Sequence, residues 1–166
     1  MPSRPDVAFL RTVPLFKDLD ETTLRALWPR LRERRLRKGE ILFRTGDPGD
    51  ELFLIYAGSI VVSKPVTGRV EQVLRRLEPG EAFGEMSLFG DEQTRSATIQ
   101  AEIDATLLGL HRDNLNQFIE SNPRDAAKFF LEMVRIAFKR LRDTSDLVAE
   151  VTRWGLEATG LDVEHT

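Results

Sequence analysis

The chain has 166 residues, of which 31% are charged, with a formal net charge of -3 and no cysteine. A chain of this length buries a hydrophobic core without staples, and the lack of cysteine excludes disulfides, thiol nucleophiles and cysteine metal ligands. The small net charge argues against a polycationic nucleic-acid binder, and with no signal peptide or long apolar run we expect a cytoplasmic protein without membrane contact.

The first predicted element is a helix from Glu21 to Leu31, which Asp20 can cap. Residues 30–38 follow with five arginines and one lysine against a single glutamate. A patch for DNA or anionic lipid is one interpretation of this stretch, and a solvated helix end that feeds a turn is the other. We favour the second, because the stretch has no aromatic residues on which bases could stack.

From Gly39 to about residue 111 the pattern changes to short apolar runs separated by glycines. Several short strands with turns every 8 to 12 residues or so are typical of a sandwich, a barrel or a jelly roll. The runs that we interpret as strands are 41–43, 52–56, 60–62, 70–77, 97–101 and 106–110.

Helical periodicity returns after the last strand. We predict one helix from Arg112 to Ser121 and a longer one from Pro123 to about Trp154. The long helix carries a heptad seam and therefore predicts a parallel coiled-coil homodimer; the alternative is a helix that packs on its own sheet and then continues exposed. The seam consists of Phe130, Val134, Ala137, Leu141, Thr144, Val148 and Val151.

The strongest candidate site lies between Phe83 and Ala101, with Gly84-Glu85-Met86-Ser87 at one end and Arg95-Ser96-Ala97-Thr98 at the other. A glycine permits close approach of the backbone, and the first N–H groups of a short helix bind phosphate. An arginine neutralises a phosphate, and an ionised glutamate accepts a hydrogen bond from a sugar hydroxyl. These residue types predict a ligand that has both a sugar hydroxyl and a phosphate.

This segment resembles the phosphate-binding cassette of the cyclic nucleotide-binding domain family, which occurs in bacterial catabolite activators, kinase regulatory subunits and nucleotide-gated channels. The resemblance continues upstream in residues 13–19, Lys38-Gly39-Glu40, residues 46–53 and Ala57-Gly58-Ser59. It implies a mainly β fold with flanking α-helices: an eight-stranded β-roll or jelly roll, an N-terminal helical segment and C-terminal B and C helices. We therefore expect a single domain over residues 1–155, with the roll at about 38–111, the long helix at about 123–154 and a short tail at 156–166.

The resemblance also implies roles for individual residues. Glu85 would bind the ribose 2′-hydroxyl, and Arg95 would pair with the cyclic phosphate. The phosphate cradle would be completed by the backbone of Gly84, Met86 and Ser87, the Ser96 hydroxyl and the Ala97 N–H.

Further candidates lie outside the core of the cassette. Val62 and Leu74 would line an apolar wall, and Phe83 opens the cassette. On the long helix, Thr144 and Ser145 of the partner subunit would bind the purine edge, and Arg140 would reach back to Glu85. Thr144 could instead be a polar seam residue that sets the register of the dimer.

The predicted function is a stand-alone regulatory sensor that binds cyclic AMP, uses no cofactor or metal, and signals by rearranging its C-terminal helices. Cyclic GMP is the nearest alternative ligand, because Ser96 can serve either the phosphate or a guanine amino group. A module of the same fold that acts as a ligand-independent interaction scaffold is a further alternative, and it predicts an occluded pocket or a salt bridge between Glu85 and Arg95 that closes it. The downstream partner is unknown.

Two other function classes are not expected. The histidines, His111 and His165, lie far apart, and adjacent acidic pairs such as Asp50/Glu51 are typical of solvated turns, so we expect no enzyme. Only about a dozen residues follow Trp154, which leaves no room for a helix-turn-helix, so we expect no direct DNA binding. A regulator that reaches DNA only through a partner stays open.

Overall fold

The computed structural model describes residues 6–68, 70–89 and 93–158. The chain divides into two compact units, Met1–Phe129 and Phe130–Thr166. The first unit begins with helices α1 (Val7–Leu10) and α2 (Glu21–Leu27) and the 3₁₀ turn η1 (Trp28–Arg30). Its strands are β1 (Leu31–Leu36), β2 (Ile41–Phe43), β3 (Glu51–Ala57), β4 (Ile60–Thr67), β5 (Val70–Leu77), β6 (Ala82–Phe83), β7 (Thr98–Ala101) and β8 (Ala105–His111).

Three more helices complete the chain. Helix α3 (Met86–Phe89) lies between β6 and β7, α4 (Arg112–Ser121) follows β8, and α5 (Pro123–Ala158) begins in the first unit and forms the described part of the second. Residues 141–158 of α5 are exposed throughout. None of the helices in the described ranges combines the length and the apolarity that crossing a bilayer requires.

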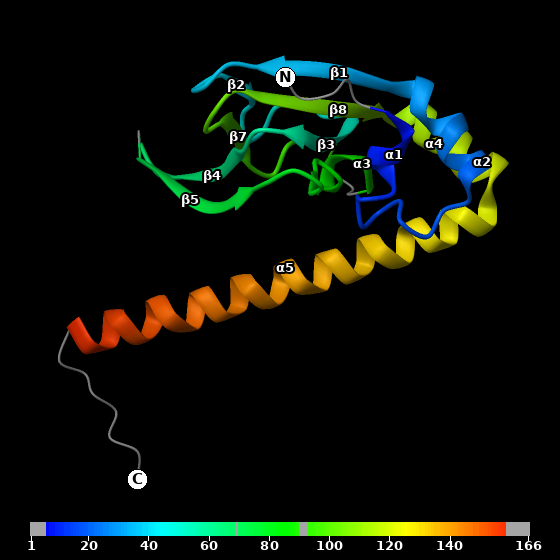
Figure 1. Ribbon diagram of the computed structural model, residues 1–166. Coiled ribbons are helices and arrows are strands. Elements are labelled where there is room, and N and C mark those ends of the chain that lie inside the picture. Colours follow the sequence, from blue (N-terminus) through cyan, green and yellow to red (C-terminus); the bar gives the residue numbers. More distant parts are fainter. Residues whose placement is uncertain (1–5, 69, 90–92, 159–166) are drawn as a thin grey trace, which may run out of the picture. The chain divides into compact units, whose positions relative to one another are not determined.

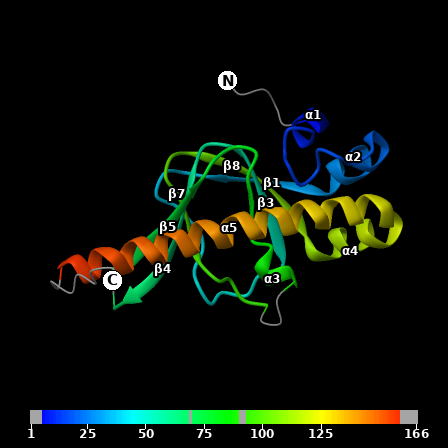
Figure 2. The ribbon, with the colours of Figure 1, turned by 90° about the horizontal axis from the view of Figure 1, so that it is seen from below.

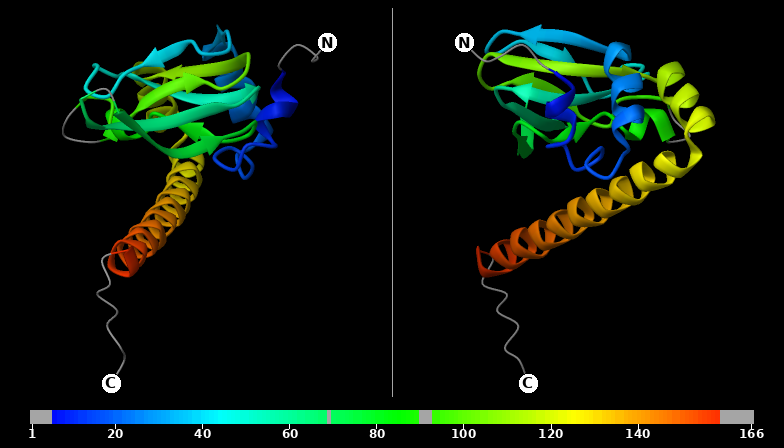
Figure 3. Two further views of the ribbon diagram at one scale, coloured as in Figure 1. Left: turned by 90° about the vertical axis from the view of Figure 1, so that its left-hand side faces the viewer. Right: turned by 45° about the vertical axis from the view of Figure 1, so that its right-hand side comes forward.

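The strands form two four-stranded sheets, ordered β1-β8-β3-β6 and β2-β7-β4-β5, and all strand pairs are antiparallel. Figure 1 shows β8 running beside β1, which forms one edge of the first sheet. Short helices lie at one end of this roll, where α1, α2 and α4 gather (Figure 3). The eight strands and the flanking helices confirm the fold class expected from the sequence.

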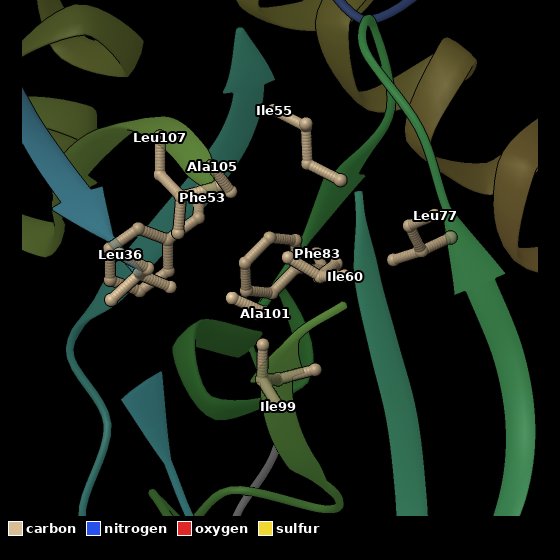
Figure 4. Packing of buried hydrophobic residues seen from close by; sticks show 10 residues of the cluster. All are labelled: Leu36, Phe53, Ile55, Ile60, Leu77, Phe83, Ile99, Ala101, Ala105 and Leu107. Carbon is tan, nitrogen blue, oxygen red and sulfur yellow. The ribbon is translucent and has the colours of Figure 1, made fainter. Parts of the chain in front are cut away.

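Buried side chains from both sheets form the core of the roll (Figure 4). The rings of Phe53 on β3 and Phe83 on β6 stack with their centroids 5.4 Å apart, and Phe43 lies 6.2 Å from each. Burial of apolar area at roughly 25 cal/mol per Å² makes such a cluster the main stabilising contribution. The stacked pair also fixes the end of β6, after which the candidate site begins. The cluster comprises Leu36, Phe53, Ile55, Ile60, Leu77, Phe83, Ile99, Ala101, Ala105 and Leu107.

Strand β1 corrects the sequence interpretation of residues 30–38, which was a helix end feeding a turn. Helix α2 ends at Leu27 rather than Leu31, and the chain passes through η1, where Pro29 lacks the N–H that an α-helix needs. Residues 31–36 then pair with β8 as an edge strand whose four charged residues are exposed. An edge strand with so little apolar alternation gives no strand signal in the sequence.

The N-terminus of α2 is capped from a distant part of the chain, which corrects a second expectation. Asp20 occupies the N-cap position, but its side chain makes no capping hydrogen bond. The carboxylate of Asp125, in the first turn of α5, accepts hydrogen bonds from the Asp20 N–H at 3.0 Å and from Lys128 Nζ at 2.9 Å. One buried carboxylate thus serves the first turns of two helices, where negative charge is favourable.

Asp125 titrates abnormally for the same reason. Burial raises the pKa of its carboxyl, but hydrogen bonds from Thr23, Lys128 and the Asp20 N–H outweigh burial, so the pKa lies below its usual value. Next to it, the ring of Phe129 packs between Phe16 at 5.5 Å and Phe118 at 5.8 Å. The start of α5 is therefore held to the N-terminal helices by both polar and apolar contacts.

We predict that Asp125→Asn lowers the free energy of unfolding by about 1.5 kcal/mol at neutral pH, because a charged acceptor is lost. Because the pKa of Asp125 is lower in the folded state, its ionised carboxylate stabilises the fold at any pH above the unfolded-state pKa of about 3.9. This stabilisation is lost as the pH falls through the folded-state pKa. The difference between wild type and variant in urea unfolding should therefore shrink below about pH 4. Asp20→Asn is the control, with an expected effect below about 0.5 kcal/mol; a larger effect there than at Asp125 would contradict the assignment.

Candidate functional site

The candidate site begins where β6 ends, at Phe83. Gly84 has a φ of +88°, a conformation that side chains disfavour. A Cβ at this position would lie 2.8 Å from Arg95 Nη1 and 2.9 Å from the carbonyl oxygen of Glu51. Helix α3 follows directly and lies against β3, as Figures 1 and 2 show. Gly84 is therefore required both by the turn and by the close approach of Arg95.

Arg95 is the centre of the site, with 5% of its surface exposed. Its Nη1 donates hydrogen bonds to the Glu51 carbonyl at 2.9 Å, to Ser87 Oγ at 2.8 Å and, more weakly, to the Gly84 carbonyl at 3.3 Å. Ser87 Oγ in turn donates to the Gly84 carbonyl at 3.0 Å. The guanidinium thus binds β3 and the start of α3 at once.

Aromatic rings and a glycine complete the surroundings of Arg95. Its guanidinium carbon lies 4.1 Å from the centre of the Phe43 ring and 5.6 Å from that of Phe53, a favourable cation–π arrangement. A Cβ on Gly49 would lie only 2.4 Å from Arg95 Nε. Among the residues that the structure describes, this buried Nε has no hydrogen-bond partner. The site therefore holds a buried cation with an unsatisfied donor.

The electrostatic surroundings of Arg95 are acidic. Burial lowers the pKa of Arg95, because removal from water disfavours the charged form. Four carboxylates lie near enough to oppose this shift: Asp50, Glu51, Asp47 and Glu85. Since an arginine side chain keeps its proton in proteins, the group stays cationic.

The other predicted cassette residues lie around this centre. The carbonyl of Glu85 accepts hydrogen bonds from the N–H groups of Leu88 and Phe89, so Glu85 begins the turn of α3. Met86 is exposed, and its sulfur lies 3.3 Å from the hydroxyl of Ser96. The structure thus brings together Gly84, Glu85, Met86, Ser87, Arg95 and Ser96, with Ala97 directly before β7.

The candidates outside the cassette belong to other elements of the chain, β4, β5 and α5. Val62 on β4 packs against the core of the roll, whereas Leu74 on β5 is 43% exposed. Thr144 and Ser145 are exposed on α5, where their hydroxyls donate to the carbonyls of Arg140 and Leu141 within the helix. The contacts of Thr144, Ser145 and Arg140 with a ligand stay predictions.

Several contributors to the site were missed in the sequence. The family resemblance implies only a backbone role for Ser87, yet its hydroxyl accepts a hydrogen bond from Arg95. Phe43 and the Glu51 carbonyl were not assigned at all, and no local pattern marks them. Gly49 belongs to the motif at residues 46–53 that supports the family resemblance. That motif does not indicate that Arg95 packs against Gly49.

Residues 33–122 match the family model described as the cyclic nucleotide-binding domain. The chain is 38% identical over 117 residues to a cyclic nucleotide-gated potassium channel of Mesorhizobium japonicum, which covers 70% of this chain and 31% of the channel. It is 28% identical over 138 residues to a CRP-like cAMP-activated global transcriptional regulator of Mycobacterium tuberculosis, covering 82% of this chain and 59% of the regulator. The chain therefore spans less than two thirds of either relative.

A solved structure is similar to this chain as well. The N-terminal domain of a transcriptional regulator from Streptomyces coelicolor superposes with a TM-score of 0.68 at 34% identity, covering 86% of this chain and 95% of that domain.

We predict that Gly49→Ala displaces the Arg95 side chain and lowers stability by about 1–3 kcal/mol, the usual range for overpacking. A Cβ only 2.4 Å from Nε leaves no room for a methyl group at this position. Thermal unfolding followed by circular dichroism measures the effect. Gly155→Ala is the matched control: a Cβ there meets nothing within 4 Å, and alanine favours a helix, so a neutral or stabilising effect is expected. Equal effects at both positions would contradict the steric argument.

Proposed function

The chain belongs to the cyclic nucleotide-binding domain family, and we propose that it is a regulatory sensor that binds cyclic AMP in the cassette between Phe83 and Ala101. The observation that carries this proposal is the buried Nε of Arg95, which has no acceptor among the described residues. A phosphate oxygen at this nitrogen would supply one and form a charge-assisted hydrogen bond. A buried cation whose N–H lacks an acceptor lowers the stability of the fold, so this arrangement is not expected for a purely structural arginine.

The acidic surroundings of Arg95 favour a cyclic phosphate over other phosphates. Four carboxylates lie near the guanidinium, and like charges repel a ligand in proportion to its charge. A phosphate monoester carries about two negative charges at neutral pH, whereas a cyclic diester carries one. One arginine among these carboxylates is thus better matched to a cyclic nucleotide than to inorganic phosphate or an open nucleotide. Glu85 is the candidate acceptor for the ribose 2′-hydroxyl.

The choice of cyclic AMP over cyclic GMP rests on the name of one relative and on two residues of α5. The Mycobacterium relative is named for activation by cAMP, and Thr144 and Ser145 are candidates for the purine edge. Cyclic GMP is the competing ligand, because the Ser96 hydroxyl can accept a hydrogen bond from the amino group of guanine.

We infer that the response is a shift between helix arrangements and that the chain itself performs no catalysis. Ligand binding changes the partners of Arg95, which include the first turn of α3 through Ser87. A ligand shifts such an equilibrium only by its differential affinity for the two arrangements. The C-terminal helices would pass this change to a partner protein.

Isothermal titration calorimetry tests the ligand and the site together. We expect wild type to bind cyclic AMP more tightly than cyclic GMP, and 5′-AMP much more weakly than either. Arg95→Met should weaken cyclic AMP binding by about 10- to 100-fold, the equivalent of one charge-assisted hydrogen bond. Arg35→Met, which removes an exposed arginine of β1 paired with Glu33, is the control and should leave affinity unchanged.

Each outcome has a separate meaning. Failure of wild type to bind either cyclic nucleotide at millimolar concentration would contradict the proposed function. Binding that survives Arg95→Met in a folded variant would contradict the site. Tighter binding of cyclic GMP would show that the site prefers guanine to adenine. Binding of 5′-AMP as tight as that of cyclic AMP would contradict the preference for a singly charged phosphate.

We also propose that α5 forms a homodimer through its heptad seam. Four seam residues, Val134, Leu141, Val148 and Val151, are each between 46% and 63% exposed. Large apolar side chains repeated on one helix face are typical of an interface.

Sedimentation equilibrium measures this association. Val148→Glu places a charge in the seam and should shift wild-type dimers to monomers. Ala149→Glu adds the same charge at the neighbouring position outside the seam and should leave the dimer intact. A wild-type monomer at high concentration, or equal dissociation by both variants, would refute the seam.

A further inference from the structure

Arg112, the first residue of α4, contacts the candidate site without being part of the cassette. Its Nη2 donates hydrogen bonds to the Ser87 carbonyl at 2.8 Å and to the Gly49 carbonyl at 3.2 Å. Its backbone N–H donates to the Asp50 carbonyl at 2.8 Å. The beginning of α4 is therefore bonded to the segment before β3 and to α3.

The two residues that the Arg112 side chain contacts, Ser87 and Gly49, also contact Arg95. Ser87 accepts from Arg95 through its hydroxyl and from Arg112 through its carbonyl. Gly49 accepts from Arg112 through its carbonyl, while its missing side chain leaves the space for Arg95 Nε. Ser87 is thus bonded to both arginines through different atoms, whereas Gly49 is bonded to Arg112 and packs against Arg95.

The needs of α4 itself do not explain an arginine at this position. A helix N-terminus carries partial positive charge, so a cation in the first turn is unfavourable there. The turn is already supported by Asp113 and by His111, whose Nδ1 accepts the Asp113 N–H at 3.2 Å. The favourable interactions of the Arg112 guanidinium that the structure shows are with Ser87 and Gly49.

We propose that Arg112 is a positioning residue of the nucleotide site. By fixing the carbonyls of Ser87 and Gly49, it holds the Ser87 hydroxyl and the Gly49 backbone where they orient Arg95. The same bonds make α4 follow any movement of α3, so a ligand that draws Arg95 Nη1 away from Ser87 displaces the start of α4. The effect on the ligand rests on the proposed function, but the positioning itself is measurable without a ligand.

The test compares Arg112→Met, which keeps the apolar stem and removes the donors, with Arg112→Lys and with Arg25→Met as control. Arg25 is an exposed helix residue paired with Glu21. Amide hydrogen exchange in the ligand-free protein is read at Leu88 and Phe89, which donate to Glu85, and at Gly49, which donates to Gln93. The amides of the β3–β8 ladder report global stability. Calorimetry with cyclic AMP follows on the same variants.

We expect Arg112→Met to accelerate exchange at Leu88, Phe89 and Gly49 by about tenfold relative to the ladder, and to weaken cyclic AMP by a similar factor. Arg112→Lys should recover part of both, and Arg25→Met should change neither. Unchanged or uniformly accelerated exchange in Arg112→Met would overturn the proposal, and so would faster local exchange with unchanged affinity. If wild type binds no cyclic nucleotide, the proposed function fails, while the exchange data still decide whether Arg112 positions these residues.

Discussion

The constraint on which the structure depends is the burial of the charge of Arg95. A buried cation is costly unless its donors find acceptors, and nearly every special feature around it meets that need. The carbonyls of Glu51 and Gly84 and the hydroxyl of Ser87 accept from one terminal nitrogen. The Phe43 ring supplies the face on which the guanidinium rests. The arrangement provides acceptors for Nη1 and leaves the buried Nε without one among the described residues.

The topology of the roll makes this arrangement possible. Strand β3 pairs with β6, with Phe53 opposite Phe83 in the register, and the stacking of those rings locks the pair. The turn after Phe83 therefore begins beside the start of β3, where the Glu51 carbonyl is available. Arg95 reaches the same place because its own N–H donates to the Asp47 carbonyl, just before β3. The hydrophobic core thus determines the geometry of a polar site.

Much of this could be predicted from local sequence, and the remainder could not for physical reasons. The glycine-punctuated runs indicated most strands, and Pro123 marked the start of α5. Strand β1 escaped prediction because its pairing with β8, rather than its own apolar alternation, decides its conformation. Asp20 looked like a cap, but the acceptor came from Asp125, 105 residues away. The cassette residues were found by their motif, whereas the role of Gly49 depends on a tertiary contact that no spacing in the chain reveals.

The charged edge strand β1 has a consequence for how copies of this protein meet. An unpaired strand edge is a template for another chain, and charged side chains on it are a common protection against such pairing. Three arginines and a glutamate on β1 are all exposed, so extending the sheet into a neighbouring molecule would bring like charges together. Strand addition and the aggregation that follows from it are therefore disfavoured while the protein folds and when it is concentrated.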